Sequence, residues 1–157
     1  MTTETQAVKC ELAADVLRSY GTLRLQVTGC SMFPAVRPGD VLVVHRIPSS
    51  SVAKGDIVLF ARDRRLFAHR VVASNGPPGS RLLTQGDAMP APDAPVCENE
   101  VLGKVSSIVR GGEHMLPRKA SRAVERLVGK LVHRSEVAAR VILGIHGLRQ
   151  ASQIRPG

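Results

Sequence analysis

Three Gly-Asp pairs separate short apolar segments in the first part of the chain, and this spacing favours a fold of short strands and tight turns. Gly39-Asp40 and Gly55-Asp56 are each followed directly by an apolar run rich in β-branched residues, and Gly86-Asp87 is the third pair. Glycine permits positive φ and aspartate bonds the nearby backbone, so each pair indicates a turn. Short strands between such turns predict a mainly β, antiparallel, barrel-like domain.

A strand is also expected before the first pair. Leu23, Leu25 and Val27 alternate with polar residues from Thr22 onward, which is the pattern of a half-buried strand. The remaining strands are expected after the first two pairs, near 66–73, near 81–85 and over Glu100 to Val109, with a Pro- and Gly-rich loop at 75–79. The Gly111-Gly112 pair would end this domain.

The N-terminus predicts one short amphipathic helix. Apolar residues recur at three- and four-residue steps between residues 7 and 20, and Gly21 follows as a stop. The residues expected on its apolar face are Val8, Leu12, Ala13, Val16 and Leu17. The sequence thus divides into an N-terminal helix at 1–21, a β domain at 22–112 and a tail at 113–157.

The positive charge gathers in the tail. The formal net charge is +9; residues 1–100 hold 11 Lys/Arg and 10 Asp/Glu, whereas residues 101–157 hold 11 and 3. Residues 119–149 carry apolar and basic side chains at helical spacing, which predicts C-terminal helices. Two interpretations stay open: these helices pack on the β domain, or their basic face binds an anionic membrane surface or an acidic partner.

The cysteines and the apolar runs bear on cofactors and location. Cys10, Cys30 and Cys97 are odd in number and widely spaced, which argues against a disulfide framework and against a zinc site, and no cofactor or metal is expected. No apolar run approaches the roughly 18 residues of a spanning helix, and the N-terminus lacks the layout of a secretory signal. We expect a soluble, cytoplasmic protein, with peripheral attachment to a membrane left open.

One serine stands in a setting that suits nucleophilic chemistry. In Gly29-Cys30-Ser31-Met32-Phe33-Pro34 the hydroxyl lies in a turn between an expected strand and a proline. Such a hydroxyl needs a base and an oriented third group before it attacks a peptide bond. Cys30 is a rival nucleophile, because a thiolate needs less activation. Adjacent residues in extended structure point to opposite faces, so only one of the two meets a single base.

The motifs that follow this serine resemble the catalytic core of type I signal peptidases. They are Pro38-Gly39-Asp40-Val41, Lys54-Gly55-Asp56-Ile57-Val58, Ala68-His69-Arg70-Val71-Val72, Gln85-Gly86-Asp87 and Asp93, and the resemblance runs from about Val27 to Val105. Bacterial members generally carry a lysine at the position of His69, whereas archaeal and endoplasmic-reticulum members carry histidine followed by Arg-Val. Resemblance to this histidine branch implies a triad of Ser31, His69 and Asp93.

The resemblance also implies roles around the triad. The Ser31 backbone N–H would be one oxyanion donor, and family members often use a second hydroxyl two residues earlier, where this chain has Gly29. Gly29 and Met32 are expected beside the substrate, with Met32 as a packing residue. Asp87 competes with Asp93 for the role of orienting His69 and is expected to form a turn instead.

These implications predict a serine endopeptidase, resembling a signal peptidase, that cleaves an extended peptide after small residues. A LexA-type self-cleaving regulator is the alternative enzyme, since it shares the fold and the Gly-x-Ser-Met start; such proteins use a lysine base, and neither Lys54 nor Lys104 occupies the matching position. The non-enzymatic alternative is an inactive basic module that binds a membrane or nucleic acid. With three Phe and one Tyr for base stacking, nucleic acid is not the expected partner.

Overall fold

A computed structural model describes residues 3–74 and 81–119. The elements in chain order are α1 (Thr3–Tyr20), β1 (Thr22–Gln26), β2 (Val41–His45), η1 (Ser49–Ser51), β3 (Ile57–Arg62), β4 (Arg65–Ser74), β5 (Leu82–Gln85), η2 (Glu98–Glu100), β6 (Val101–Arg110) and β7 (Glu113–Met115), where η marks a short 3-10 helix. All the strand pairings are antiparallel. The predicted mainly β fold with an N-terminal helix is confirmed. The predicted loop at 75–79 and the predicted helices at 119–149, apart from Lys119, lie outside the described residues.

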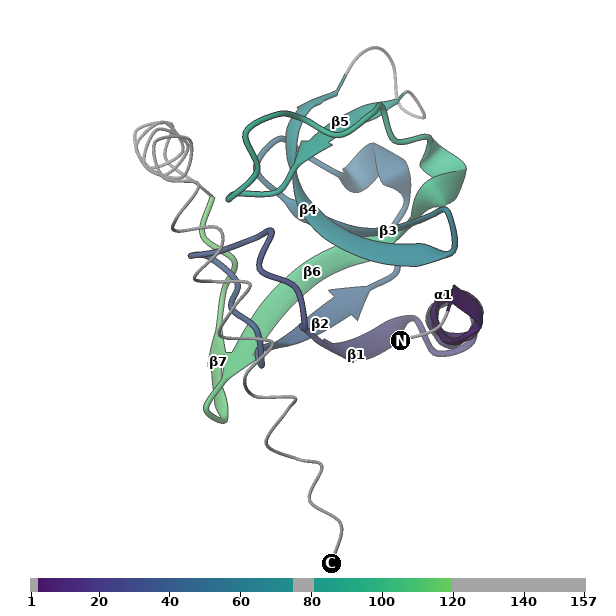
Figure 1. Ribbon diagram of the computed structural model, residues 1–157, viewed down its shortest axis with the longest axis horizontal. Helices are drawn as coiled ribbons and strands as arrows, with labels where there is room; N and C mark the ends of the chain where they lie inside the picture. Colours follow the sequence, from purple (N-terminus) through teal and green to yellow (C-terminus); the bar gives the residue numbers. More distant parts are fainter. Residues whose placement is uncertain (1–2, 75–80, 120–157) are drawn as a thin grey trace, which may run out of the picture. The chain divides into compact units, whose positions relative to one another are not determined.

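The strands form one sheet in the order β1-β2-β6-β3-β4-β5, and β7 pairs with β6. Among the described strands β6 is the last long one, yet it runs through the middle of the sheet between β2 and β3 (Figure 1). Residues Val43 and Ser107 pair on one side of it, and Val58 pairs with Lys104 on the other. One side of the sheet, β1 and β2, is therefore joined to β3, β4 and β5 through β6.

The sheet is open, which differs from the barrel that the sequence predicted. Among the described strands, β1 and β5 are the two edges and no pairing joins them. The outer edge of β5 is taken by the chain that returns after it, because Leu82 forms a bridge with Val96 and the Asp93 N–H bonds the Thr84 carbonyl.

The sheet also continues beyond Gly112, where the sequence suggested its end. Gly111 and Gly112 both have positive φ, 58° and 87°, a conformation that L side chains rarely adopt. They form the turn of a hairpin, and β7 returns along β6 with Met115 paired to Ile108. The double glycine therefore reverses the chain within the sheet.

The predicted helix is present, and it buries part of the predicted face, Ala13 and Leu17, together with Cys10. Cys10, Ala13 and Leu17 are buried, whereas Val8 and Leu12 are 58% and 61% exposed, so the expectation for these two was wrong. The helix contacts β1, β4 and β6, and the small side chains of Cys10 and Ala13 face the domain where close approach is needed. Within the described residues no helix is long and apolar enough to cross a membrane.

β3 is buried on both faces and separates two apolar clusters. Ile57 and Leu59 belong to a cluster that includes Leu17 of α1, and Val58 and Phe60 belong to a second cluster with Val71. Successive strand residues point to opposite faces, which explains the alternation. Burying each such side chain contributes about 1.5–3 kcal/mol. β4 pairs with β3, and it carries His69 beside the second cluster.

The first two Gly-Asp pairs form the predicted turns, and each is tied to β6. Each glycine has a φ of 94°, and each aspartate accepts a hydrogen bond from the backbone N–H three residues earlier. Asp40 pairs with Arg110 at 2.7 Å, and Asp56 pairs with Lys104 at 2.9 Å. The hydrogen bonds from Arg110 lower the pKa of the Asp40 carboxyl.

Candidate active site

Ser31 lies in the loop that joins β1 to β2. The loop closes at its base, where the Val27 N–H bonds the Asp40 carbonyl at 2.8 Å and the Gly39 N–H bonds the Val27 carbonyl at 2.8 Å. Within this loop Met32 and Val36 are buried in the first apolar cluster, and this packing fixes the loop to the core. Met32 therefore packs in the core and is only 3% exposed, and its predicted place beside the substrate stays a prediction.

His69 lies within β4, opposite Val58 of β3, and is only 4% exposed. Its ring has Phe67 on the same strand face at a centroid distance of 5.8 Å and the edge of Phe60 at 5.9 Å. A buried imidazole is costly unless both nitrogens are paired. Because Phe60 and Phe67 offer no hydrogen-bonding side-chain atom, the two nitrogens of His69 need polar partners from other residues.

Those partners are Ser31 and Asp93, which meet at His69 although the sequence separates them widely. Nε2 of His69 lies 3.0 Å from Oγ of Ser31, and Nδ1 lies 2.7 Å from Oδ2 of Asp93. An ionised carboxylate can only accept, so Nδ1 carries the proton and Nε2 is left to accept from the serine hydroxyl. The three residues thus have the contacts of a nucleophile, a base and an orienting acid.

Asp93 reaches His69 because the chain after β5 folds back on that strand. The Asp93 N–H donates to the Thr84 carbonyl at 2.8 Å, and the fully buried Thr84 hydroxyl donates to Oδ2 of Asp93 at 2.7 Å. Oδ2 therefore accepts from both Thr84 and His69. The Pro-rich segment 88–92 lies in this returning loop, between β5 and Asp93. With this segment in place, Asp93 still reaches the imidazole.

Asp87 is engaged elsewhere. Its two oxygens accept from Nε and Nη2 of Arg70 at 2.8 and 2.7 Å, and the Arg70 side chain is 2% exposed. Nη1 of Arg70 also donates to the carbonyls of Gly55 and Arg118, both at 2.9 Å. The Asp87 carboxylate thus binds Arg70 of β4, and Asp93 is the carboxylate that contacts the imidazole.

The sequence did not reveal Thr84 or the tight contact at Gly86. Thr84 is one polar residue among the alternating positions of β5, and nothing in its local pattern distinguishes it from a surface threonine. Gly86 is buried, and its neighbour Ala88 donates its N–H to the Ser31 carbonyl at 2.8 Å. The third Gly-Asp pair therefore joins the loop of Asp93 to the loop of Ser31.

The other candidate groups are placed apart from this arrangement. Gly29 is exposed, and a β-carbon there would meet nothing within 4 Å. Lys104 is paired with Asp56 and Lys54 is exposed, so the residue that contacts Ser31 is a histidine. Cys30 is half-buried and unpaired, and the hydrogen bond to Nε2 of His69 comes from Ser31.

Comparison with known families places this arrangement. The family model for Peptidase S24-like proteins matches residues 2–106, which is more than half of the chain. This range includes Ser31, His69 and Asp93. The chain belongs to the Peptidase S24-like family. This membership supports a serine peptidase or a LexA-like self-cleaving protein in general. A comparison of this S24-like protein with curated proteins gave no match.

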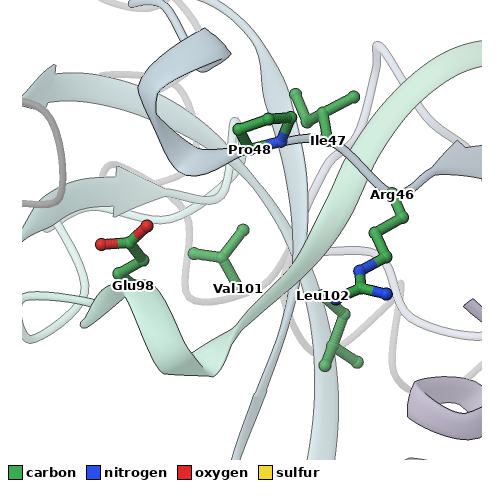
Figure 2. Close-up of a pocket in the computed structure, with 6 residues that line it drawn as sticks. All are labelled: Arg46, Ile47, Pro48, Glu98, Val101 and Leu102. Carbon is green, nitrogen blue, oxygen red and sulfur yellow. The ribbon is translucent and has the colours of Figure 1, made fainter. Parts of the chain in front are cut away.

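The S24-like protein also has a pocket whose lining residues differ from those around His69. This pocket has a volume of about 490 Å³ and an apolar lining of Ile47, Pro48, Val101 and Leu102, with Arg46 and Glu98 at its sides (Figure 2). The lining contains no serine, cysteine or histidine. In the described part of the chain, no three His, Cys, Asp or Glu side chains are grouped to hold a metal.

Proposed function

We propose that this S24-like protein is a serine endopeptidase of the signal-peptidase type, with Ser31 as nucleophile, His69 as base and Asp93 as orienting acid. The observation that carries the proposal is the position of the His69 ring, which contacts the Ser31 hydroxyl with one nitrogen and the Asp93 carboxylate with the other. The histidine at this position, followed by Arg70, is also what relates the chain to the histidine branch of signal peptidases.

The reaction follows from these contacts. Nε2 of His69 takes the proton as Oγ of Ser31 attacks the substrate carbonyl, and Asp93 stabilises the imidazolium that forms. His69 then gives the proton to the leaving amine, which leaves an acyl-enzyme on Ser31. Water, activated by the same imidazole, releases the new carboxyl end of the substrate.

The Ser31 backbone N–H is the oxyanion donor in this proposal. No described group accepts a hydrogen bond from it, and it opens the turn in which the Phe33 N–H bonds the Cys30 carbonyl at 3.0 Å. A donor fixed in a turn stabilises developing charge without reorganisation. Gly29 precedes it with an open surface, which leaves room for the substrate backbone.

The proposed substrate is an extended peptide with small side chains before the cut. β1 lies at an edge of the sheet, and the chain that leaves it leads to Ser31 within a few residues. A peptide that pairs with such an edge is held by its backbone. Phe33 and Met89, each 44% exposed, present apolar surface in the two loops that meet at Ser31, which favours small apolar side chains over charged ones.

Self-cleavage of the LexA type is the second candidate, because the family model supports it in general. The two candidates differ in where the scissile bond lies, in another molecule or in the chain itself. They share Ser31, so a serine variant alone does not separate them. The mass of the protein itself does.

One experiment tests both candidates. The purified protein is incubated with a diverse peptide pool beside Ser31→Ala, and both the peptides and the intact protein are analysed by mass spectrometry. Cuts after small residues that need Ser31 support the endopeptidase. A shortened protein with an untouched pool would favour self-cleavage, and an unchanged pool with an unchanged protein would contradict both.

A further inference from the structure

Arg62, at the end of β3, holds the loop that carries Asp93. Its Nη1 donates to the Ala94 carbonyl at 2.9 Å and its Nη2 donates to the Pro95 carbonyl at 2.8 Å. These are the two carbonyls that follow Asp93 directly in the chain. One side chain thus fixes the backbone on the far side of Asp93, while Thr84 fixes its N–H and one carboxylate oxygen.

The direction of this guanidinium is set by Glu100. Nε and Nη2 of Arg62 donate to the two oxygens of Glu100 at 2.7 and 2.8 Å, and Glu100 also accepts from the Cys97 N–H at 2.7 Å. The two side chains are 22% and 23% exposed, so solvent competes only partly. The bonds from Arg62 lower the pKa of Glu100 to about 2, and they raise the pKa of Arg62. A two-pronged pair of this kind fixes orientation as well as distance.

The same guanidinium also packs on Phe60, an aromatic ring that contacts His69. The carbon at its centre lies 5.7 Å from the centroid of the Phe60 ring, and the edge of Phe60 packs against His69 at 5.9 Å. Phe60 stacks in turn on Phe67 at 5.4 Å. Arg62 therefore contacts one neighbour of His69 and the loop of its carboxylate partner.

We infer that Arg62 is a positioning residue for the His69–Asp93 pair: its fork holds the 94–95 backbone and its face packs on Phe60, which keeps Nδ1 and Oδ2 in register. The inference deepens the proposed function and depends on it for its catalytic meaning. An error of about 1 Å in such a pair lowers turnover by up to about a hundred-fold. Substrate binding, which uses other groups, should be nearly unaffected.

The full-length protein offers a matched control. Arg110 makes the same kind of two-pronged pair, with Asp40 at 2.9 and 2.7 Å, and also donates to the Ala35 carbonyl at 3.3 Å. It is 28% exposed and makes no contact with the 94–95 backbone. Arg62→Gln and Arg110→Gln thus remove comparable bonds, of which only the first set is next to Asp93.

The readout is the proton NMR resonance of the hydrogen shared between His69 and Asp93, recorded at low temperature, with Asp93→Asn to assign it. Short bonds to a carboxylate move this signal far downfield. We expect Arg62→Gln to shift or broaden it, Arg110→Gln to leave it, and Arg62→Lys to fail as a rescue, because lysine keeps the charge but loses the fork. With a peptide that the protein cleaves, Arg62→Gln should lower kcat about ten- to hundred-fold and change KM less than about two-fold.

A wild-type resonance in folded Arg62→Gln would overturn the inference. If Arg62→Gln does not fold, Glu100→Gln replaces it, since this change keeps the arginine but loosens its direction; a wild-type resonance there would equally overturn it. Absence of the signal from the unaltered protein would remove the His69–Asp93 pair and the role of Arg62 together. A resonance that responds to Arg62 in a protein that cleaves no peptide would uphold the inference and contradict the proposed function instead.

Discussion

A β-carbon at Gly86 would lie 2.6 Å from the carbonyl oxygen of Ser31. It would also lie 2.7 Å from Cγ of Met89 and 3.2 Å from Nε2 of His69. Gly86 is not one of the described glycines with positive φ. A side chain is therefore excluded at this position by lack of space and not by the backbone conformation. The loop of Asp93 and the loop of Ser31 can touch only if this residue lacks a side chain.

Gly86→Ala should therefore impair catalysis as well as stability. The added methyl group must displace the Ser31 backbone, and a small displacement of a nucleophile costs about ten- to hundred-fold in kcat. Gly103→Ala is the control, because its β-carbon would lie 2.5 Å from the His45 carbonyl, away from His69. Both should lose stability, about 1–3 kcal/mol for overpacking. Equal kcat losses in the folded fractions of both variants would contradict a specific role for Gly86.

Ser31→Ala should abolish peptide cleavage, whereas Cys30→Ser should keep most of it. The hydrogen bond to Nε2 of His69 comes from Ser31, and the neighbouring side chain has no such contact. Kinetics on a peptide identified from the pool, together with labelling by a serine-reactive probe, check this. Loss of activity only in Cys30→Ser would make the protein a cysteine peptidase.

Thr84→Val should lower kcat by about ten-fold or more, because Oδ2 of Asp93 loses one of its two donors. Hydrogen bonds to charged groups contribute about 1.5–3 kcal/mol, and valine nearly matches the volume of threonine in this fully buried position. Thr84→Ser keeps the hydroxyl and should recover most of the turnover. If Thr84→Ser is as slow as Thr84→Val, the lost methyl packing and not the hydroxyl is responsible.

Acid should weaken the fold through Glu100. Its pKa in the folded protein is about 2, below the ordinary 4.5, chiefly because of the hydrogen bonds from Arg62. The stabilisation is therefore complete above about pH 4.5 and is lost as the pH falls towards 2, by up to about 3 kcal/mol. Urea unfolding of the wild type and Glu100→Gln at several pH values measures this. An equally steep loss of stability in Glu100→Gln over this range would contradict the assignment.

A chain that ends at Pro117 should be less stable than one that ends at Ala120. Only the longer one keeps the Arg118 carbonyl, which accepts from the buried Arg70 guanidinium at 2.9 Å. A buried donor without its partner costs about 1–3 kcal/mol, more for a charged group. Thermal unfolding of the two truncated proteins compares them directly. Identical midpoints would mean that water replaces the carbonyl at no cost.

The strands were predictable because their signals are local. Turn glycines, aspartates and two-residue alternation lie within a few positions of one another, and β1 to β6 appear where these patterns place them. The helix face was not predictable in the same way. Leu17, Ala13 and Cys10 are buried whereas Val8 and Leu12 are exposed, and which side of the helix is covered depends on a surface built by distant residues.

The geometry at His69 was predictable only through the resemblance. Ser31 and Asp93 reach the imidazole from opposite directions along the chain, and no local pattern relates them. The supporting residues Thr84 and Arg62 have even less signal, because a single polar residue in a strand is usually solvated. Their meaning comes from the loop that returns along β5, which is a long-range feature of the fold.

The central place of β6 links the completion of the chain to the assembly of the site. β1 and β2 flank the loop of Ser31, while His69 and Thr84 belong to β4 and β5, and β6 pairs with β2 on one side and with β3, the partner of β4, on the other. During synthesis Ser31 and His69 would thus both be made before the strand that joins their two parts of the sheet. In the proposed function, hydrolysis would therefore begin only after β6 has joined the sheet.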